Sequence, residues 1–405
     1  MFMTPAESVS LPSPGRPAAS RSPFVRLREL LGDTPPSRPP ISLAVGEPQH
    51  AVPSFVGPVL AAHLGEFGRY PMNKGLDEFC AAAAAWLGRR FALPRPVDSA
   101  TEVLVLNGSR EGLFLAAIAA ERWVNGRSGR PAILMPNPFY GAYEAGALAA
   151  NCEAVYLPAT AANGFLPDLD ALPDELLKRT VAFYLASPAN PQGSVADPSY
   201  FERLIALARR FGFLLFSDEC YSEIYTQRPP ASALEVAGPG FQNVVVFQSL
   251  SKRSNLPGLR VGFVAGDRNF LARFLELRNV ASPQVPIPAQ RVAIAAYGDE
   301  AHVEDNRRLY ALKFDLAEQI LGGRYGYRRP AGGFLLWLDV SAHGGDEAVT
   351  LRLWREAGLR VVPGRYLARE QAGGSNPGAG YIRVALVQDQ ATTAEALHRL
   401  IGVLG

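Results

Sequence analysis

The sequence contains few of the residues that build disulfide frameworks and metal centres. Its 405 residues include three cysteines, Cys80, Cys152 and Cys220, and five histidines, all widely separated. An odd number of distant cysteines argues against a disulfide framework, and neither residue type shows the spacing of metal ligands. We therefore expect no metal site.

Long hydrophobic runs and a dominant charge are also missing. No apolar run approaches the roughly 18 residues of a membrane span, and the first 22 residues lack the apolar segment of a secretory signal. The net charge is +2, with acidic and basic residues interspersed, so no broad basic face favours nucleic acid or an anionic membrane. These absences predict a cytoplasmic protein whose partners are small molecules.

Lysine is scarce. Of the 40 lysines and arginines, four are lysines and thirty-six are arginines. Lys178 and Lys313 are expected on the polar faces of amphipathic helices, and Lys74 lies in a loop flanked by glycine and proline. Any chemistry that needs a lysine amine therefore points to Lys252, because only this lysine follows a predicted buried strand.

Short apolar runs alternate with helical patterns along the chain. Residues 199–212 carry apolar side chains at three- and four-residue spacing, as in a helix with one buried face. Strands alternating with such helices predict an α/β protein with a mainly parallel sheet, in which ligands bind beyond the carboxyl ends of the strands. Seven apolar runs predict strands buried on both faces of this sheet: 103–106, 132–135, 154–157, 181–185, 213–216, 244–247 and 261–264.

Three groups of residues that follow these runs have either a functional or an ordinary structural explanation. Gly108 and Ser109 begin a helix and can present donors to an anion or simply cap the helix. Tyr140 can lie over a flat ligand or fill the core. Asn190 can contact a ligand or belong to a turn.

Asp218 and Glu219 follow the run 213–216 after a single residue, Ser217. Carboxylates are costly to bury, so we expect at least one of the pair to have a cationic or hydrogen-bonding partner. A structural salt bridge is the alternative explanation.

Lys252 follows the run 244–247 in the stretch QSLSKRSNLPGLR. A partly dry pocket beside Arg253 and Arg260 should lower the pKa of its amine and make it a nucleophile toward carbonyls. Ser249, Ser251 and Arg260 supply donors for a phosphate. Together with Asp218, a phenol, an aromatic face and an amide, this set matches the needs of pyridoxal 5′-phosphate (PLP), which we predict as the cofactor.

The order of these motifs resembles that of the fold type I, PLP-dependent aminotransferases of classes I and II. The motifs are NPQG (190–193), DECY (218–221), SLSK (249–252), Arg260, and Arg383 in YIRVAL, and the resemblance covers residues 23–404. It implies a large domain with a mainly parallel seven-stranded sheet and a smaller α/β domain. We assign residues 1–40 to an N-terminal arm, partly disordered, residues 41–55 and 296–405 to the small domain, and residues 56–295 to the PLP-binding domain.

The resemblance also implies a role for each site residue. Lys252 would form the Schiff base with the cofactor and move the proton between Cα and C4′, and Asp218 would keep the pyridine nitrogen protonated. Tyr221 and Asn190 would hydrogen-bond the 3′-oxygen, while Tyr140 would stack on the ring.

The remaining implied roles concern the phosphate and the substrate. Tyr70 matches the tyrosine that reaches the phosphate of the partner subunit, which implies a homodimer with composite sites. Gly46, Asn190 and Arg383 would bind the substrate, with Arg383 taking the α-carboxylate as a bidentate pair. Within one chain, the phosphate would be held by Gly108, Ser109, Arg110, Ser249, Ser251 and Arg260.

Longer stretches, including SLSKRSNLPGLRVGFVAGD and DECYSEIY, are most similar to bacterial N-succinyl-LL-2,6-diaminopimelate aminotransferases of lysine biosynthesis. This similarity implies transfer of the amine of glutamate to N-succinyl-2-amino-6-oxopimelate. The chain departs from that pattern at residues 281–286, near the substrate in such enzymes, and also at Gln192 and Lys74.

Three other functions compete with this one. An aminotransferase of aromatic or broad specificity and a PLP-dependent carbon–sulfur β-lyase share the fold and the lysine. A non-catalytic, cofactor-binding regulator is disfavoured, because the first forty residues are too short and too rich in proline to form a DNA-binding domain.

Overall fold

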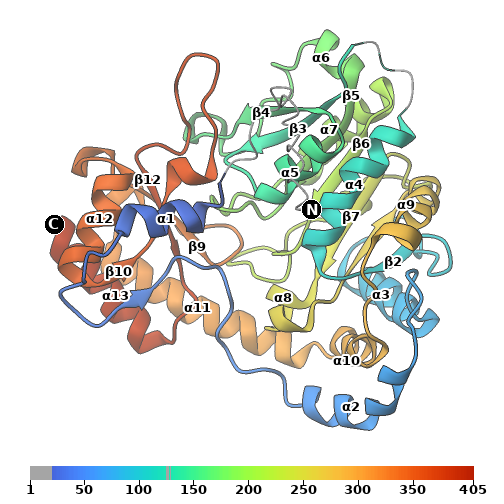
Figure 1. Ribbon diagram of the computed structural model, residues 1–405, viewed down its shortest axis with the longest axis horizontal. Helices are drawn as coiled ribbons and strands as arrows, with labels where there is room; N and C mark the ends of the chain where they lie inside the picture. Colours follow the sequence, from blue (N-terminus) through green and yellow to red (C-terminus); the bar gives the residue numbers. More distant parts are fainter. Residues whose placement is uncertain (1–20, 125–126, 128) are drawn as a thin grey trace, which may run out of the picture.

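The computed structural model describes residues 21–405 except 125, 126 and 128. The described chain forms a large α/β unit around a seven-stranded sheet and a second unit built mainly from its C-terminal part (Figure 1). The disorder predicted for residues 1 to about 22 lies, up to residue 20, outside the described residues.

All seven predicted strands are present in the large sheet. Their spatial order is β2-β8-β7-β6-β5-β3-β4, and every neighbouring pair is parallel except those that involve β8. The mainly parallel sheet is therefore confirmed. The strands are β2 (Val103–Leu106), β3 (Ala132–Asn137), β4 (Glu153–Pro158), β5 (Thr180–Ala186), β6 (Leu214–Asp218), β7 (Val244–Ser249) and β8 (Gly262–Gly266).

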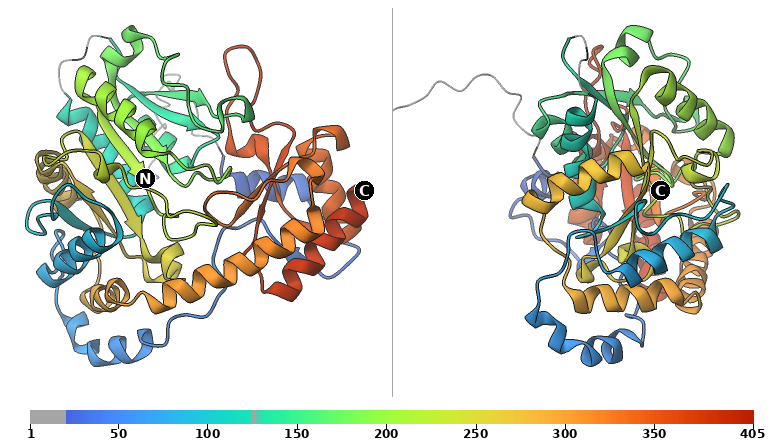
Figure 2. Two further views of the ribbon diagram at one scale, coloured as in Figure 1. Left: turned by 180° about the vertical axis from the view of Figure 1, so that it is seen from behind. Right: turned by 90° about the vertical axis from the view of Figure 1, so that its right-hand side faces the viewer.

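Helices cover both faces of this sheet, because successive side chains of a strand point to opposite sides. In β2, Val103 and Val105 pack on one face and Leu104 and Leu106 on the other. The right-hand view of Figure 2 shows α4 and α9 on one side and α7 on the other. The first face is covered by α3 (Asp77–Arg90), α7 (Pro198–Phe211) and α10 (Ile287–Gly298), the second by α4 (Ser109–Trp123), α5 (Gly141–Ala149) and α9 (Arg268–Ala281).

One prediction about burial is wrong. The strand β4 lies at the edge of the sheet, and its first four residues are only half-buried. An edge strand has a neighbour on one side alone, so its apolar run does not imply burial on both faces.

The predicted helix at residues 199–212 is α7, and its ends follow ordinary capping rules. The Asp197 carboxylate accepts a hydrogen bond from the backbone N–H of Tyr200, and Pro198 occupies the first turn. Gly212 ends the helix with a φ of 70°. The buried stripe consists of Phe201, Leu204, Ile205 and Ala208.

The C-terminal part forms a second core around an antiparallel sheet of order β11-β12-β9. The long helix α11 runs from α10, near the large sheet, to the C-terminal helices (Figure 2, left). This part contains α11 (Ala301–Leu321), β9 (Leu335–Asp339), α12 (Asp346–Ala357), β10 (Leu359–Arg360), β11 (Val362–Pro363), β12 (Tyr381–Ala385) and α13 (Gln390–Leu404).

The N-terminal segment packs against this second unit. The helix α1 (Pro23–Leu31) contacts α12, and β1 (Ile41–Ser42) pairs in parallel with β10. The sequence reading missed α1, although Ser22 and Pro23 are a typical cap and first residue of a helix. The division into an arm at 1–40, a small domain at 41–55 and 296–405, and a large domain at 56–295 stays our proposal.

The remaining elements are short. They are α2 (Val56–Ala62), α6 (Asp174–Arg179), α8 (Leu250–Arg253) and the 3-10 helices Leu64–Gly68, Ala161–Asn163, Ala233–Glu235, Pro257–Leu259, Arg324–Gly326, Ser341–His343 and Gly364–Leu367. Within the described ranges, no helix is long and apolar enough to cross a membrane. The same ranges hold no group of three or more His, Cys, Asp or Glu side chains that could bind a metal.

Candidate active site

Lys252 lies on α8, immediately after the carboxyl end of β7. Its Nζ donates a hydrogen bond to the backbone carbonyl of Gly46, in the segment that follows β1. The pKa of Lys252 is lowered to about 8, mainly by burial and in part by the charge of Arg383. At neutral pH the amine is therefore much closer to its neutral, nucleophilic form than an exposed lysine is.

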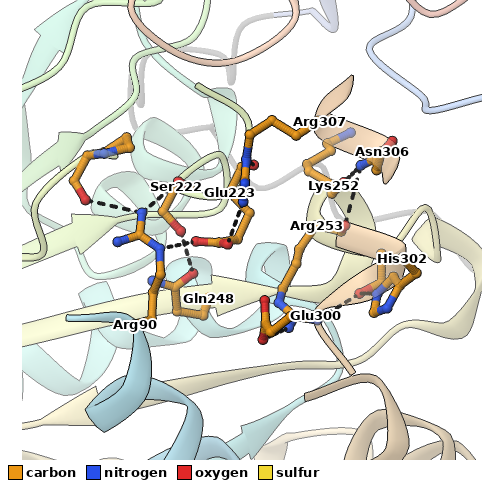
Figure 3. A network of polar contacts seen from close by, with 12 residues as sticks. Arg90, Ser222, Glu223, Gln248, Lys252, Arg253, Glu300, His302, Asn306 and Arg307 are labelled. Atoms are coloured by element: carbon orange, nitrogen blue, oxygen red, sulfur yellow. Dashed lines mark hydrogen bonds and ion pairs between the residues drawn. The ribbon is translucent and has the colours of Figure 1, made fainter. Parts of the chain in front are cut away.

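The direction of this shift was predicted, but its attribution to Arg253 and Arg260 was wrong. The charges that act on Lys252 include Arg383 and Arg110, and burial is the largest cause. The guanidinium of Arg253 points away and forms a 2.6 Å ion pair with Glu300 (Figure 3). A neighbour in sequence on a one-turn helix need not be a neighbour in space.

Asp218, the last residue of β6, is buried and has hydrogen-bonding partners but no cation within hydrogen-bonding distance in the described structure. The hydroxyl of Tyr143 donates to its Oδ2 at 2.7 Å, and the backbone N–H of Cys220 donates to its Oδ1 at 3.3 Å. Burial raises the pKa of Asp218, and these two hydrogen bonds oppose the rise. A buried carboxylate that lacks a cation is suited to receive one from a ligand.

Glu219 has a different, structural role. Its carboxylate accepts hydrogen bonds from the hydroxyls of Ser217 and Ser232 and from the side chain of Gln248 at about 3 Å. Burial raises its pKa to about 7. The expectation that the Asp218–Glu219 pair needs hydrogen-bonding partners is confirmed, and the two side chains point into separate environments.

Arg383, in β12, is buried and lies beside Asn190. Its Nη1 donates to Oδ1 of Asn190 at 3.1 Å, and its Nη2 donates to the carbonyl of Ala44 at 2.7 Å. Its Nε is buried without a hydrogen-bonding partner. Because no carboxylate among the described residues pairs with this guanidinium, the site holds an uncompensated positive charge that an anionic ligand can satisfy.

Tyr221 and Gly46 close the other side of Lys252. A Cβ built on Gly46 would lie 3.7 Å from the Tyr221 hydroxyl and 3.4 Å from the ring of Phe334. The Lys252 amine lies 5.8 Å from the centre of the Tyr221 ring and 5.3 Å from that of Phe334. The two rings and the glycine thus form a narrow wall around the amine.

The predicted phosphate residues meet where β2 and β7 end. Arg260 has a φ of 57°, and its guanidinium hydrogen-bonds the backbone carbonyls of Pro257 and Asn107. It packs so closely on Gly108 that any Cβ there would collide with it. Ser249 donates a 2.9 Å hydrogen bond from its hydroxyl to Oγ of Ser251.

Ser109, Arg110 and Tyr140 extend this donor group. Ser109 is the first residue of the fifteen-residue helix α4, whose N-terminal N–H groups favour an anion. Arg110 donates from Nε to the Tyr140 hydroxyl at 2.6 Å. Neither Arg110 nor Arg260 forms an ion pair with a carboxylate of the described chain, so both charges are available to a phosphate.

Tyr70 is the predicted site residue that the single chain does not bring to the others. Its side chain is 96% exposed. An expectation that it serves a partner subunit therefore stays a prediction.

The sequence reading missed two residues that contact the site. Tyr143 holds Asp218, as described above, and follows Tyr140 by three residues on the same helical turn. Asn306, on α11, donates from Nδ2 to the backbone carbonyl of Lys252 at 3.1 Å. Figure 3 shows this contact beside a second network, in which Arg90 and Arg307 both bind Glu223.

Comparison with known proteins gives a consistent class. A family model described as aminotransferase class I and II matches residues 38–400. The chain is 32% identical over 366 residues to an LL-diaminopimelate aminotransferase from Syntrophobacter fumaroxidans, covering 89% of this chain and 90% of that protein.

Two solved structures extend the comparison. An aminotransferase from Neisseria meningitidis has 40% sequence identity and a TM-score of 0.89, with 96% of this chain and 98% of that chain covered. A probable N-succinyldiaminopimelate aminotransferase from Thermus thermophilus has 26% identity and a TM-score of 0.83, with coverages of 95% and 100%.

The fold, together with these matches, defines an α/β enzyme of the fold type I, PLP-dependent class. The chain belongs to the class I and II aminotransferases. It is a PLP-dependent aminotransferase, and its substrates are amino acids and oxo acids.

The residues present fit this cofactor. An amine of lowered pKa, a buried carboxyl without a cationic partner, and a group of phosphate donors lie at one edge of the sheet. Arg260 can reach its position in this donor group only because Gly108 has no side chain.

Proposed function

We propose that this aminotransferase transfers the amine of glutamate to N-succinyl-2-amino-6-oxopimelate through the site around Lys252. The observation that carries the proposal is Arg383, a buried guanidinium without a carboxylate partner in the described chain, 3.1 Å from Asn190. Such a group suits the α-carboxylate that amino and oxo acid substrates share. The identity of the acceptor is supported by the similarity to diaminopimelate aminotransferases.

The residues that would hold the cofactor act on separate parts of it. Asp218 would accept a hydrogen bond from the protonated ring nitrogen, while Tyr221 and Asn190 would contact the 3′-oxygen and Tyr140 would cover one ring face. Bound PLP supplies an aldehyde that condenses with amines and a ring that accepts the electron pair released at Cα. The phosphate would be held by Gly108, Ser109, Arg110, Ser249, Ser251 and Arg260.

Lys252 is assigned the transfer of the Cα proton. Its Nζ, when neutral, would accept the proton that leaves Cα of the amino acid and would deliver it to C4′ of the cofactor. The lowered pKa, about 8, lies near physiological pH, where a general base is most effective. Gly46 accepts a hydrogen bond from Nζ and so orients the amine toward the substrate side of the site.

We assign Arg383 and Gly46 to substrate binding. The two outer nitrogens of Arg383 bind the α-carboxylate as a bidentate pair, for which the arginine fork is suited and the lysine ammonium is not. We expect Arg383→Lys to raise KM for glutamate at least tenfold, since one of two charge-assisted hydrogen bonds is lost. The affinity for PLP should be unchanged, because Arg383 is assigned to the substrate.

A second acceptor class is favoured by one observation. The curated relative described above is named for LL-diaminopimelate, without the succinyl group. In the enzymes that the chain resembles, the segment at residues 281–286 lies near the substrate, so we expect its departures to affect the choice of acceptor. The side chain of Gln192 is buried and lines the same small apolar pocket as Asn190 and Tyr140.

A panel of amino acceptors with glutamate as donor tests the proposal. We expect the succinylated oxopimelate to give the highest kcat/KM. The reaction is followed as 2-oxoglutarate formed from glutamate or, in reverse, consumed with LL-diaminopimelate. A preference for the unsuccinylated compound would support the second acceptor class. A preference for aromatic or varied oxo acids would contradict both.

Two further controls address the reaction class. Lys252→Ala should lack the visible absorbance band of the covalently attached cofactor and should lose turnover. Release of pyruvate and ammonia from cystathionine without amine transfer would instead support a β-lyase and contradict the transaminase assignment of the natural reaction.

We also propose that the enzyme is a homodimer in which Tyr70 reaches the phosphate of the partner subunit. Its 96% exposure in the single chain supports this role, as do its exposed apolar neighbours Leu64, Phe67 and Met72. Hybrid dimers of Tyr70→Ala and Lys252→Ala subunits should recover part of the activity, because one of their two sites keeps both wild-type residues. Sedimentation of a monomeric, active enzyme would refute the proposal.

A further inference from the structure

A chain of buried and half-buried polar side chains leads from the C-terminal unit to Lys252. The Nζ of Lys313 lies 2.7 Å from Nε2 of His50, and Nδ1 of His50 lies 2.7 Å from Oδ1 of Asn306. Nδ2 of Asn306 donates to the backbone carbonyls of Lys252, at 3.1 Å, and Arg253, at 3.3 Å. The prediction that Lys313 lies on a polar helix face is therefore wrong, since it is 1% exposed.

The hydrogen bonds of this chain have one consistent direction. Because Nδ2 of Asn306 donates to two carbonyls, its Oδ1 accepts, and Nδ1 of His50 must carry the proton. Nε2 of His50 then has a free lone pair, which accepts from the ammonium of Lys313. Burial lowers the pKa of His50, which keeps the ring neutral as this arrangement requires.

The chain connects the segments that surround Lys252. His50 belongs to the segment after β1 that begins with Gly46, whose carbonyl accepts a hydrogen bond from Nζ of Lys252. Lys313 also donates to the carbonyl of Leu386, just after β12, at 3.1 Å. Asn306 immediately precedes Arg307 on α11 and faces the α8 turn (Figure 3). These contacts fix α8, the segment 46–50 and α11 relative to one another.

Burying the Lys313 amine in this way costs more free energy than a purely structural contact requires. Burial lowers the pKa of Lys313 to about 8, and among the described residues no carboxylate hydrogen-bonds its amine. The groups that face it are His50, the Leu386 carbonyl, the Tyr310 ring at 4.9 Å and, at longer range, Asp389. A leucine or methionine would fill such a position at lower cost in burial.

We propose that Asn306, His50 and Lys313 are positioning residues for Lys252, which hold the α8 turn and the segment 46–50 so that Nζ of Lys252 faces the Gly46 carbonyl. The proposal rests on the function proposed for Lys252. It concerns orientation only, since none of the three side chains is assigned to the cofactor or the substrate.

The test compares Lys313→Met, His50→Gln and Asn306→Leu with Lys178→Met, an exposed lysine on α6 as control. In the holoenzyme we measure the pH midpoint at which the cofactor's visible absorbance band changes, and separately the rate of the half-reaction with glutamate. We expect the midpoint to shift by about half a pH unit or more and the rate to fall on the order of tenfold, with a smaller change in KM. Lys313→Arg should restore part of both.

A double-mutant cycle tests whether the residues act as one chain. Lys313→Met combined with Asn306→Leu should cost less than the sum of the single changes, because the first substitution already disrupts what the second would remove. Purely additive losses would overturn the coupling. If Lys313→Met does not fold, His50→Gln serves in the cycle, since His50 is only half-buried.

The outcomes separate this proposal from the proposed function. An absent absorbance band in the wild-type holoenzyme would refute the role of Lys252 itself. A normal wild-type band, with midpoints and half-reaction rates unchanged in the variants, would refute the positioning role alone. A lower melting temperature with an unchanged midpoint would likewise assign these residues to stability and not to positioning.

Discussion

The hydroxyl of Tyr143 donates a 2.7 Å hydrogen bond to Oδ2 of Asp218, between α5 and the end of β6. Burial raises the pKa of Tyr143 far above its usual value, so the hydroxyl stays protonated and remains a donor. One oxygen of Asp218 is thereby occupied from the protein side. The other, Oδ1, accepts the 3.3 Å hydrogen bond from the backbone N–H of Cys220 and can also accept one from the protonated nitrogen of the cofactor ring in the function we propose.

Removing this hydroxyl should weaken cofactor binding. Tyr143→Phe leaves the buried carboxyl short of one hydrogen bond, at a cost of about 1.5 kcal/mol, or about a tenfold rise in the Kd of PLP. Equilibrium dialysis of the apoenzyme with PLP measures this change.

Tyr184→Phe is the matched control. Tyr184 stacks on Tyr143 with ring centres 4.5 Å apart, but its hydroxyl donates to the carbonyl of Leu113. Tyr184→Phe should lower the free energy of unfolding without changing the Kd of PLP. Equal effects of the two variants on the Kd would show that the aromatic stack matters and the hydrogen bond to Asp218 does not.

Gly108 should tolerate no side chain. Gly108→Ala combines a φ of 73° with a collision against the Arg260 guanidinium. We expect the displaced arginine to raise the Kd of PLP at least tenfold, because one charge-assisted hydrogen bond to the phosphate is lost.

A second glycine separates the two causes. Gly345→Ala, at the N-cap of α12, has a similar backbone conformation, with φ 86° and ψ 176° against 73° and 155° at Gly108, and open space around its Cβ. Both substitutions place alanine in a conformation that only glycine adopts readily, at a cost of about 1–3 kcal/mol, and should lower the melting temperature comparably. If PLP binds both variants with wild-type affinity, Arg260 does not hold the phosphate.

The residues that follow apolar runs could be predicted from sequence because a parallel sheet brings its carboxyl ends together. Lys252 and Asp218 were identified in this way, and both lie at those ends. The predicted effect of Arg253 on the pKa of Lys252 was wrong because a one-turn helix points adjacent side chains in different directions. Its partner Glu300, 47 residues away, has no signal in the local sequence.

The sequence of α11 contains a signal for the buried polar network. Its buried residues follow a three- and four-residue spacing that includes the polar Asn306 and Lys313. The spacing alone would have placed Lys313 in the buried stripe, but its charge favoured the opposite face. Polar residues inside an apolar stripe are therefore candidates for a buried network. The partners on distant segments, His50 and Leu386, could not be predicted without the tertiary structure.

The low pKa of Lys252 should appear in its reactivity in the apoenzyme. Labelling with acetic anhydride proceeds through the neutral amine, so the rate for Lys252 should rise with pH and level off above about 8. Lys178 is an internal control, because its ion pair with Glu175 raises its pKa above the ordinary value. Mass spectrometry of the two labelled peptides gives both profiles from one sample. Profiles that rise in parallel up to pH 10 would contradict a lowered pKa for Lys252.

The pKa of Lys313 should appear in the stability of the protein. Below pH 8 both the folded and the unfolded chain hold the proton, and the cost of burying the charge is fully present. Between about 8 and the ordinary value of 10.5 the folded chain releases the proton and the unfolded chain keeps it. The free energy of unfolding of the wild type should therefore rise with pH, relative to Lys313→Met, by about 1.4 kcal/mol per pH unit.

Comparison of two variants isolates this slope. Contributions from buried tyrosines and cysteines are common to the wild type and Lys313→Met, so they cancel in the difference. Urea unfolding of the apoenzyme between pH 7 and 9.5 measures the difference, and Lys178→Met should stay parallel to the wild type because Lys178 is exposed and its pKa is not lowered. A constant difference between the wild type and Lys313→Met across this range would mean that Lys313 keeps an ordinary pKa in the folded protein. The ammonium would then persist well above pH 8, and the hydrogen bond to His50 would not respond to pH in the physiological range.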